Sequence, residues 1–232
     1  YVIKEFNSGG LREKSIREIL VMNELEHPCI CKLFASTISK CEFNDEVEIN
    51  LLLSYMSNGN LSNTIKLAEK GEINWDVTSK MKALYGIAAG MAYLHSHKAI
   101  HRDLKPLNIL MDENFEVKIS DFGTSRFIGD SRNELTYSLG TPYFIAPEII
   151  NGHIYDSKVD VYSYSIILYM VLYKSQLKSA SYFAILQDVV NGKRLPIDES
   201  KFLYGKGLLK LINDCWSGSP ARRPSFSEIL RI

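Results

Sequence analysis

Two short segments near the middle of the chain carry polar side chains that could perform phosphate chemistry. The first is the run 101–108, His-Arg-Asp-Leu-Lys-Pro-Leu-Asn, and the second is 121–123, Asp-Phe-Gly. Carboxylate and amide oxygens are the ligands that Mg²⁺ prefers, and a carboxylate can accept a proton from an attacking hydroxyl. These residue types favour phosphoryl transfer with Mg²⁺. The alternative is a hydrogen-bonded loop network without catalysis.

Short β-type segments flank both polar loops. We expect strands at 99–100, 109–111 and 117–120, with a turn at 112–114 between the last two. The polar loops would therefore lie at strand ends, over a cleft.

The start of the chain is rich in β-type sequence. Residues 1–6 alternate like a strand, an amphipathic helix is expected over 11–26, and Pro28 excludes its continuation. Two further strands are expected at 30–39 and 47–55. The residues at helical spacing in this first helix are Ile16, Ile19, Leu20 and Asn23.

Helices dominate after a turn cluster at 57–60. Asn60 can cap a helix that Gly71 ends, Asp76 can cap a longer helix, and 159–173 is typical of a helix buried on all sides. That last stretch is shorter than the roughly 20 residues that a bilayer requires. An apolar stripe on the longer helix contains Met81, Leu84, Ile87, Ala88, Met91 and Leu94.

The composition is typical of a globular protein. Of 232 residues, 46% are hydrophobic and 23% charged, and 27 basic side chains balance 27 acidic ones. A net charge of zero offers no overall field for nucleic acid or an anionic membrane, so we expect neither partner. Cys29, Cys31, Cys41 and Cys215 match no disulfide framework or zinc site, which favours an intracellular, cytoplasmic location.

Three motifs in this order resemble those of the eukaryotic protein kinase family. The run 101–108 is similar to its catalytic loop, 121–123 to its metal-binding loop, and 140–148, Gly-Thr-Pro-Tyr-Phe-Ile-Ala-Pro-Glu, to the motif that closes its activation segment. The resemblance implies a two-lobed α+β fold. Residues 1–56 would form a partial small lobe with an antiparallel sheet and one helix, and 57–232 a larger, mainly helical lobe.

The resemblance also implies roles for the polar residues. Asp103 would accept or orient the proton of the attacking hydroxyl, and Lys105 would neutralise charge on the transferring phosphoryl group. Asn108 and Asp121 would hold the Mg²⁺ ions that bridge the phosphates of ATP.

On the first strand, Lys4 matches the lysine that orients the phosphates of ATP, and Glu18 on the following helix matches its ion-pair partner. Taken alone, such a pair would be a solvated surface feature, because exposed ion pairs contribute only up to about 1 kcal/mol. Within the resemblance, the pair would fix the direction of Lys4 toward the nucleotide.

The adenine pocket would be lined by residues from both lobes. Leu53 matches the gatekeeper, Met56 the hinge residue whose backbone meets the ring, and Leu110 the floor of the pocket. Val2 stands where the family usually has Ala, which would narrow the pocket. A plain core strand would explain the leucine run 51–53 equally well.

Other positions resemble parts of the family's scaffold. Asp160 matches an acid that ties down the backbone of the catalytic loop, and Glu148 with Arg223 matches a buried salt bridge. An apolar column between the lobes would contain Met22, Leu33, His101 and Phe122.

The catalytic loop favours serine and threonine as acceptors. Lys105, Pro106 and Thr141 match the serine/threonine pattern, with Thr141 expected to hydrogen-bond Asp103 and Lys105. The segment 160–164 looks like the tyrosine-kinase-like group, which leaves dual specificity open.

The resemblance also indicates a switch. A cation at Arg102 can receive a phosphate from the activation segment. One of residues 136–138 (Thr-Tyr-Ser) is the hypothesised regulatory site, with Ser131 a further candidate acceptor; the alternative is an unregulated loop rich in hydroxyls.

One family feature is absent from the sequence as given. The glycine-rich loop that precedes the lysine strand is missing, and Tyr1 is an unusual natural start, so we expect a fragment that is inactive by itself. The leading hypothesis is a protein serine/threonine kinase acting on protein substrates. The alternatives are a pseudokinase-like scaffold and a small-molecule phosphotransferase, although the latter has no use for 140–148.

Overall fold

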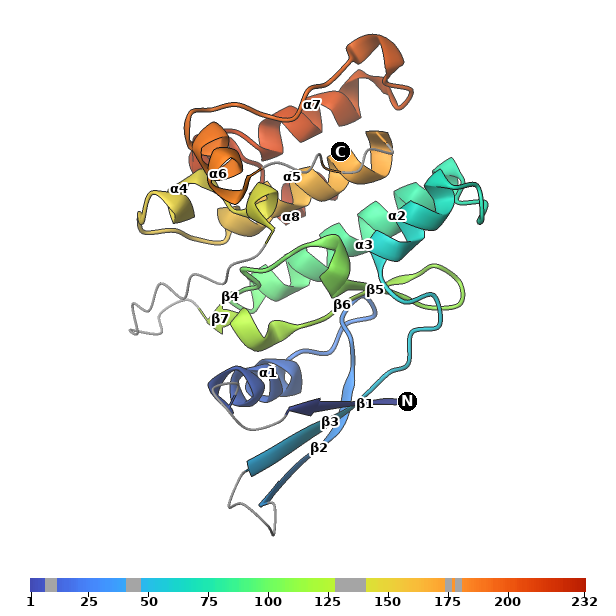
Figure 1. The fold of residues 1–232 in the computed structure, drawn as a ribbon, viewed down its shortest axis with the longest axis vertical. Coiled ribbons are helices and arrows are strands. Elements are labelled where there is room, and N and C mark those ends of the chain that lie inside the picture. The colour runs from blue at the N-terminus through green and yellow to red at the C-terminus, as the bar shows by residue number, and fades with distance from the viewer. Residues whose placement is uncertain (7–11, 41–46, 128–140, 174–176, 178–180) are drawn as a thin grey trace.

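A small sheet with one helix forms one end of the molecule, and helices form the other end (Figure 1). The computed structural model describes residues 1–6, 12–40, 47–127, 141–173, 177 and 181–232. The three-stranded sheet is antiparallel with the order β1-β3-β2. Its elements and the neighbouring helix are β1 (Val2–Phe6), β2 (Leu33–Lys40), β3 (Val47–Leu53) and α1 (Arg12–Glu24).

The central strand β3 gives the sheet its inward face. Ile49, Leu51 and Leu53 are all buried, because alternate residues of a strand point to the same side. Lys4 pairs in register with Leu51, and Val2 with Leu53. Residues directly opposite in an antiparallel pair share a face, so this register places Lys4 on the inward side of the sheet.

Helix α1 buries a different face from the one that its apolar spacing suggested. Ile16 is 39% exposed and Leu20 is 59% exposed. The helix packs instead on the 3-10 turn Phe122–Thr124, and this packing selects a face that includes polar residues. Its buried residues are Ser15, Glu18, Val21 and Met22.

The helical part is built around α3 and α5, and the predicted caps are confirmed. Asn60 accepts a hydrogen bond from the Asn63 amide, and Asp76 accepts one from the Ser79 amide, so each closes a helix start. The stripe on α3 lies in the core, with Met81 only partly buried. The helices are α2 (Leu61–Glu69), α3 (Val77–Ser96), α4 (Pro147–Ile150), α5 (Lys158–Tyr173), α6 (Tyr182–Val190), α7 (Gly205–Cys215) and α8 (Phe226–Ile229).

Short strands lie between the sheet and the helices, as Figure 1 shows. They pair as two antiparallel ribbons, β4 with β7 and β5 with β6. The segment that follows α1 pairs with the second ribbon at Ile119. The Cys31 amide donates to the Ile119 carbonyl (2.8 Å), and the Ile119 amide donates to the Cys29 carbonyl (2.8 Å). The strands are β4 (Ala99–Ile100), β5 (Ile109–Met111), β6 (Val117–Ile119) and β7 (Arg126–Phe127).

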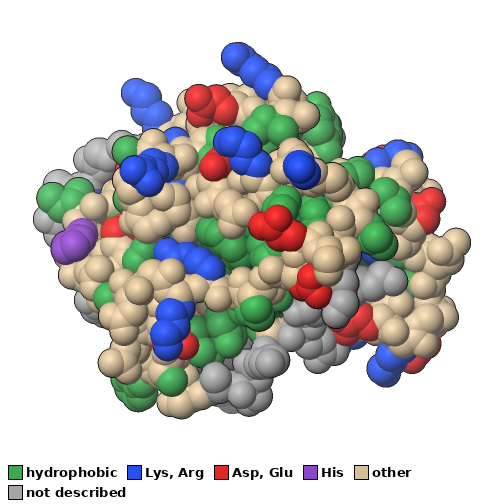
Figure 2. Space-filling model, turned by 90° about the horizontal axis from the view of Figure 1, so that it is seen from above, with side chains coloured by type: hydrophobic (Ala, Val, Ile, Leu, Met, Phe, Trp, Pro, Cys, Tyr) green, Lys and Arg blue, Asp and Glu red, His purple; other side chains and the backbone are tan. Residues whose placement is uncertain are grey.

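The surface shows charges of both signs, and the described cysteines are free thiols. On the helical end face, basic and acidic side chains are interspersed with apolar ones (Figure 2). Cys29, Cys31 and Cys215 are free thiols, and Cys41 lies outside the described residues. Within the described ranges, no helix combines the length and apolar character needed to cross a membrane.

Candidate active site

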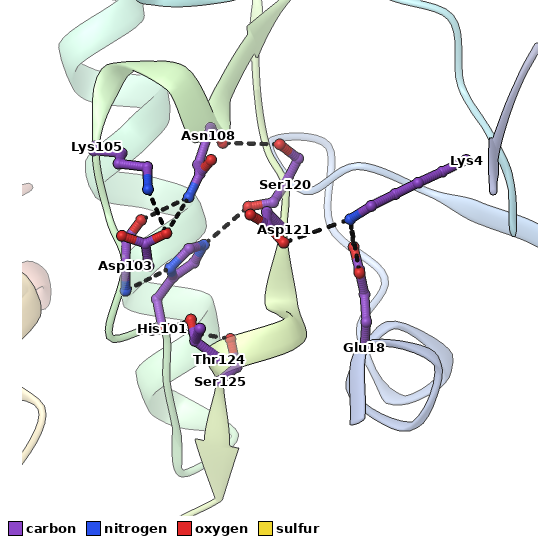
Figure 3. Close-up of polar contacts among 10 residues, drawn as sticks. All are labelled: Lys4, Glu18, His101, Asp103, Lys105, Asn108, Ser120, Asp121, Thr124 and Ser125. Atoms are coloured by element: carbon purple, nitrogen blue, oxygen red, sulfur yellow. Dashed lines mark hydrogen bonds and ion pairs between the residues drawn. The ribbon is translucent and has the colours of Figure 1, made fainter. Parts of the chain in front are cut away.

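Lys4 joins two parts of the chain that are distant in sequence. Its ammonium lies 2.9 Å from Glu18 Oε1 and 2.8 Å from Oε2, so it binds both carboxylate oxygens of a residue on α1. The same ammonium lies 3.4 Å from Asp121 Oδ1. In Figure 3, β1 and α1 approach Asp121 from one side. Lys4, its expected ion-pair partner Glu18 and the expected metal ligand Asp121 therefore meet.

The two carboxylates around Lys4 lie in different environments, Glu18 buried and Asp121 partly exposed. Burial raises the pKa of Glu18, and the charge and hydrogen bonds of Lys4 work against that rise without cancelling it. The side chain of Asp121 is 46% exposed, and its φ of 64° puts its backbone in the left-handed region. This unusual backbone conformation is typical of functional sites.

The catalytic loop forms a second polar cluster. The Lys105 ammonium lies 2.6 Å from Asp103 Oδ2, and Asn108 Nδ2 donates to the same oxygen at 3.0 Å. Asn108 Nδ2 also donates to the Asp103 carbonyl at 2.8 Å. Among the described residues, no donor reaches Asn108 Oδ1, and an amide oxygen is a ligand type that Mg²⁺ accepts.

Ser120 links the two clusters, a role that the sequence analysis did not assign to it. Its amide and its hydroxyl both donate to the Asn108 carbonyl, at 2.9 and 3.0 Å. The pairing of Ile109 with Ile119 in β5 and β6 sets this geometry. Asn108 and Asp121 are thereby held on adjacent segments (Figure 3). In the sequence, the only indication of this role for Ser120 is that it precedes Asp121.

Asp160 holds the backbone of the catalytic loop, as its resemblance implied. Its carboxylate accepts the His101 amide and the Arg102 amide, each at 2.9 Å, and lies 2.8 Å from His95 Nε2. Burial would raise the pKa of Asp160, but the hydrogen bond and charge of His95, together with contributions from His101, outweigh it and the pKa is lowered. The contribution of His95 was not expected from the sequence.

His101 is a packing residue. Its Nδ1 accepts a hydrogen bond from the Asp103 amide (3.3 Å), which leaves Nε2 to donate to the Ser120 carbonyl (3.0 Å). This network assigns the neutral Nε2–H tautomer, with both nitrogens occupied. The ring centroids of His101 and Phe122 lie 5.2 Å apart, and both residues are buried.

The rest of the scaffold forms as expected. Met22 is buried and Leu33 packs partly buried against the core, like the predicted apolar column. Arg223 forms two hydrogen bonds with Glu148, at 2.6 and 2.8 Å, in the interior of the helical part.

The residues expected at the adenine pocket lie on neighbouring segments. Leu53 is buried at the end of β3 opposite Val2, which is half exposed. Met56 follows on the connection to α2, and Asn60 in the same connection forms a β-bridge with Leu110. The connection therefore lies over β5.

One expected contact is not formed. Thr141 is exposed, and within the described ranges its hydroxyl makes no hydrogen bond to Asp103 or Lys105. Lys105 and Asn108 bind the Asp103 carboxylate instead, both at Oδ2. The expected regulatory residues at 131 and 136–138 lie outside the described residues.

The fold is α+β, with a small sheet at one end and helices at the other. Carboxylates, an amide and lysines gather between these ends, which is typical of enzymes that act on phosphates. The chain belongs to the protein kinase family: the family model described as the protein kinase domain matches residues 1–232. Protein kinase domains in general use ATP and Mg²⁺ and act on proteins.

Curated relatives match over nearly the whole chain. A serine/threonine-protein kinase of Dictyostelium discoideum is 36% identical over 99% of the chain, which covers 21% of that protein. A protein of Acanthamoeba polyphaga mimivirus, described as a serine/threonine-protein kinase/receptor, is 35% identical over 99% of the chain and 13% of its own length. The dual specificity protein kinase shkB of D. discoideum is 33% identical over 92% of the chain, which spans 32% of its length.

Proposed function

We propose that the protein containing this domain transfers the γ-phosphate of ATP to serine or threonine hydroxyls of protein substrates. The observation that carries the proposal is the meeting of Lys4, Glu18 and Asp121 next to the Asp103 cluster. A scaffold that only binds partners has no need to gather these groups. No observation on the described residues favours the pseudokinase alternative.

The chain's own residues divide the chemistry between them. Asp103 is placed to orient the attacking hydroxyl and accept its proton, and Lys105 to neutralise the phosphoryl group. Lys4, fixed by Glu18, would contact the nucleotide phosphates. Asn108 Oδ1 and the Asp121 carboxylate fit Mg²⁺, which would supply charge neutralisation on the phosphates.

Adenine would lie between the lobes, here taken as 1–56 and 57–232. Within the described residues the Met56 amide has no hydrogen-bond partner, whereas its carbonyl accepts from Gly59. That amide is free to donate to the ring. Val2, Leu53 and Leu110 would provide apolar walls and the floor.

The acceptor preference rests on Lys105 and on the relatives, two of which are named as serine/threonine kinases. The dual specificity relative keeps tyrosine as a second acceptor to be tested. Free Cys29, Cys31 and Cys215 support a reducing, intracellular location.

A transfer assay tests the proposal. The natural protein, with any residues that precede Tyr1 retained, is incubated with γ-labelled ATP, Mg²⁺ and peptides that offer serine, threonine or tyrosine. We expect label on serine or threonine, and a loss of roughly 10²-fold or more in Asp103→Asn. Nucleotide binding with transfer no greater than that of Asp103→Asn would instead indicate a scaffold.

A further inference from the structure

A cavity of about 480 Å³ lies where the C-terminal end of α1, the segment that follows it and β6 come together. A volume of this size suits a small organic ligand. Its lining comes from α1 and the segment up to Leu33, from Ser54 after β3 and from Lys118 on β6. None of the residues expected to contact ATP or Mg²⁺ lines it. The cavity is therefore distinct from the candidate active site.

The buried part of the lining is apolar. Met22 on α1, Leu25 just after it and Ile30 on the following segment are each at most 6% exposed. Leu33, at the start of β2, adds a partly buried side chain that packs against the same core. Apolar walls of this kind favour a ligand whose body is apolar.

The lining carries one net positive charge. Lys32 and Glu26 line the cavity as an ion pair, with the ammonium 2.9 Å from Oε1, so their charges offset each other. The ammonium of Lys118 donates to the neutral carbonyl of Pro28. Across the described ranges, no carboxylate forms an ion pair with Lys118. Its charge is available to an anion, since a charge-assisted hydrogen bond to a carboxylate is stronger than one to a carbonyl.

His27 also lines the cavity but adds no second charge. Its Nδ1 accepts a hydrogen bond from the Cys29 amide (3.0 Å), so the neutral ring carries its proton on Nε2. Burial lowers the pKa of His27, and the charge of Lys118 lowers it further. The described lining also contains no arginine, the usual bidentate partner of a phosphate group. The site is therefore suited to a monoanion such as a carboxylate.

We propose that this cavity binds a small carboxylic acid with an apolar body. The carboxylate would bind Lys118, and the body would pack against Met22 and Leu25. The site goes beyond the proposed kinase activity and does not depend on it. A bound acid would join the C-terminal end of α1 to β6.

Calorimetric titration tests the site on the natural protein, with any residues that precede Tyr1 retained. The probes are 4-phenylbutyrate and its neutral amide, 4-phenylbutanamide. We expect the acid to bind with a Kd of about 1 mM or tighter. The amide should bind about tenfold more weakly, because only the acid offers a charge to Lys118. Equal affinities for the two probes, or no binding of the acid, would overturn the proposal.

Two variants locate the charge and the cavity. Lys118→Met should weaken binding of the acid about tenfold and leave the amide unchanged. Lys210→Met, at an exposed ion pair on α7, is the matched control and should bind both probes as wild type does. Asn23 is exposed and lines the cavity, so Asn23→Trp should obstruct it and weaken both probes without removing the hydrogen bond of Lys118. Unchanged binding in Lys118→Met and Asn23→Trp would contradict the assignment.

Hydrogen exchange shows where the acid binds. Saturating 4-phenylbutyrate should slow exchange of amides in 22–33 and 117–119, and excess ATP with Mg²⁺ should not displace it. Displacement by ATP would place the acid in the nucleotide site and overturn the proposal. So would binding of the acidic peptide acetyl-Gly-Phe-Asp-Gly-amide without binding of 4-phenylbutyrate, because the ligand class would then be a protein segment. If the wild type transfers no phosphate, the kinase proposal fails, while the titrations still decide whether the acid binds.

Discussion

Lys4 and Glu18, fourteen positions apart, are joined by two hydrogen bonds of 2.9 and 2.8 Å between β1 and α1. The carboxylate is buried and the lysine side chain is 34% exposed. The pKa of Glu18 stays raised in spite of Lys4. The pair therefore does more to position Lys4 than to stabilise the fold.

Replacing Glu18 should separate activity from stability. Glu18→Gln removes a carboxylate whose burial raises its pKa above 4.5, so the folded protein binds this proton more tightly than the unfolded chain does. The wild type must then lose stability as pH rises from about 4.5 through the raised pKa. We expect the stability of Glu18→Gln relative to wild type to increase over that window, measured by urea unfolding at several pH values.

The activity of Glu18→Gln should fall roughly tenfold to hundredfold, because Lys4 loses a charge-assisted partner. Glu24→Gln is the control, since Glu24 is exposed on the same helix. A variant that is less stable than wild type at every pH would show that the pair is mainly structural.

Asp121→Asn should remove the metal dependence of nucleotide binding while leaving the fold intact. Asn tolerates the left-handed conformation that Asp121 adopts, with φ at 64°, and its amide oxygen can still accept from Lys4. Calorimetry should show that Mg²⁺ tightens ATP binding in the wild type but not in the variant. We expect kcat to fall roughly 10²–10³-fold. The control is Asp214→Asn, at an exposed ion pair on α7, which should behave as wild type. If Mg²⁺ still tightens ATP binding in Asp121→Asn, Asp121 is not a ligand of the Mg²⁺ ion.

The buried pair of Glu148 and Arg223 should dominate the stability of the helical part. Glu148→Gln leaves the Arg223 guanidinium without its anion in the interior, which should cost about 3–5 kcal/mol of unfolding free energy. Asp188→Asn breaks the exposed pair with Lys193 and should change stability by less than about 1 kcal/mol. Chemical denaturation of both variants measures the contrast, and equal small effects would contradict it.

Gly90 should not tolerate a methyl group. A Cβ there would lie 2.7 Å from Ile119 Cδ1 and 3.1 Å from the Cys29 carbonyl oxygen, where the segment after α1 packs on α3. Overpacking costs about 1–3 kcal/mol and should outweigh the gain of about 1 kcal/mol in helix propensity. Gly90→Ala should therefore lower the urea midpoint.

Gly207 provides the opposite case on α7. A Cβ at this position would meet nothing within 4 Å, so Gly207→Ala should stabilise the protein by about 0.5–1 kcal/mol. Stabilisation by both alanines would show that α3 and the segment at Cys29 can separate without cost.

Local sequence predicted much of the secondary structure. The caps at Asn60 and Asp76, the β-ribbon of 109–111 with 117–119 and the buried helix after Asp156 all follow from residue types and spacing over a few positions. Such features depend on neighbours in the chain, and those are present in the sequence itself. The polar residues of the site were identified from their motifs for the same reason.

Contacts between distant segments were decided by the tertiary structure. Apolar spacing indicated a face of α1 with Ile16 and Leu20, whereas packing on Phe122–Thr124 buries the side with Glu18. Helical periodicity predicts that a helix has an apolar face, but the segment that packs on the helix comes from elsewhere in the chain and decides which face is buried. The hydrogen bond from Arg102 to Tyr155, 53 positions away, has no local signature, since only the folding of the loop behind α4 brings the two together.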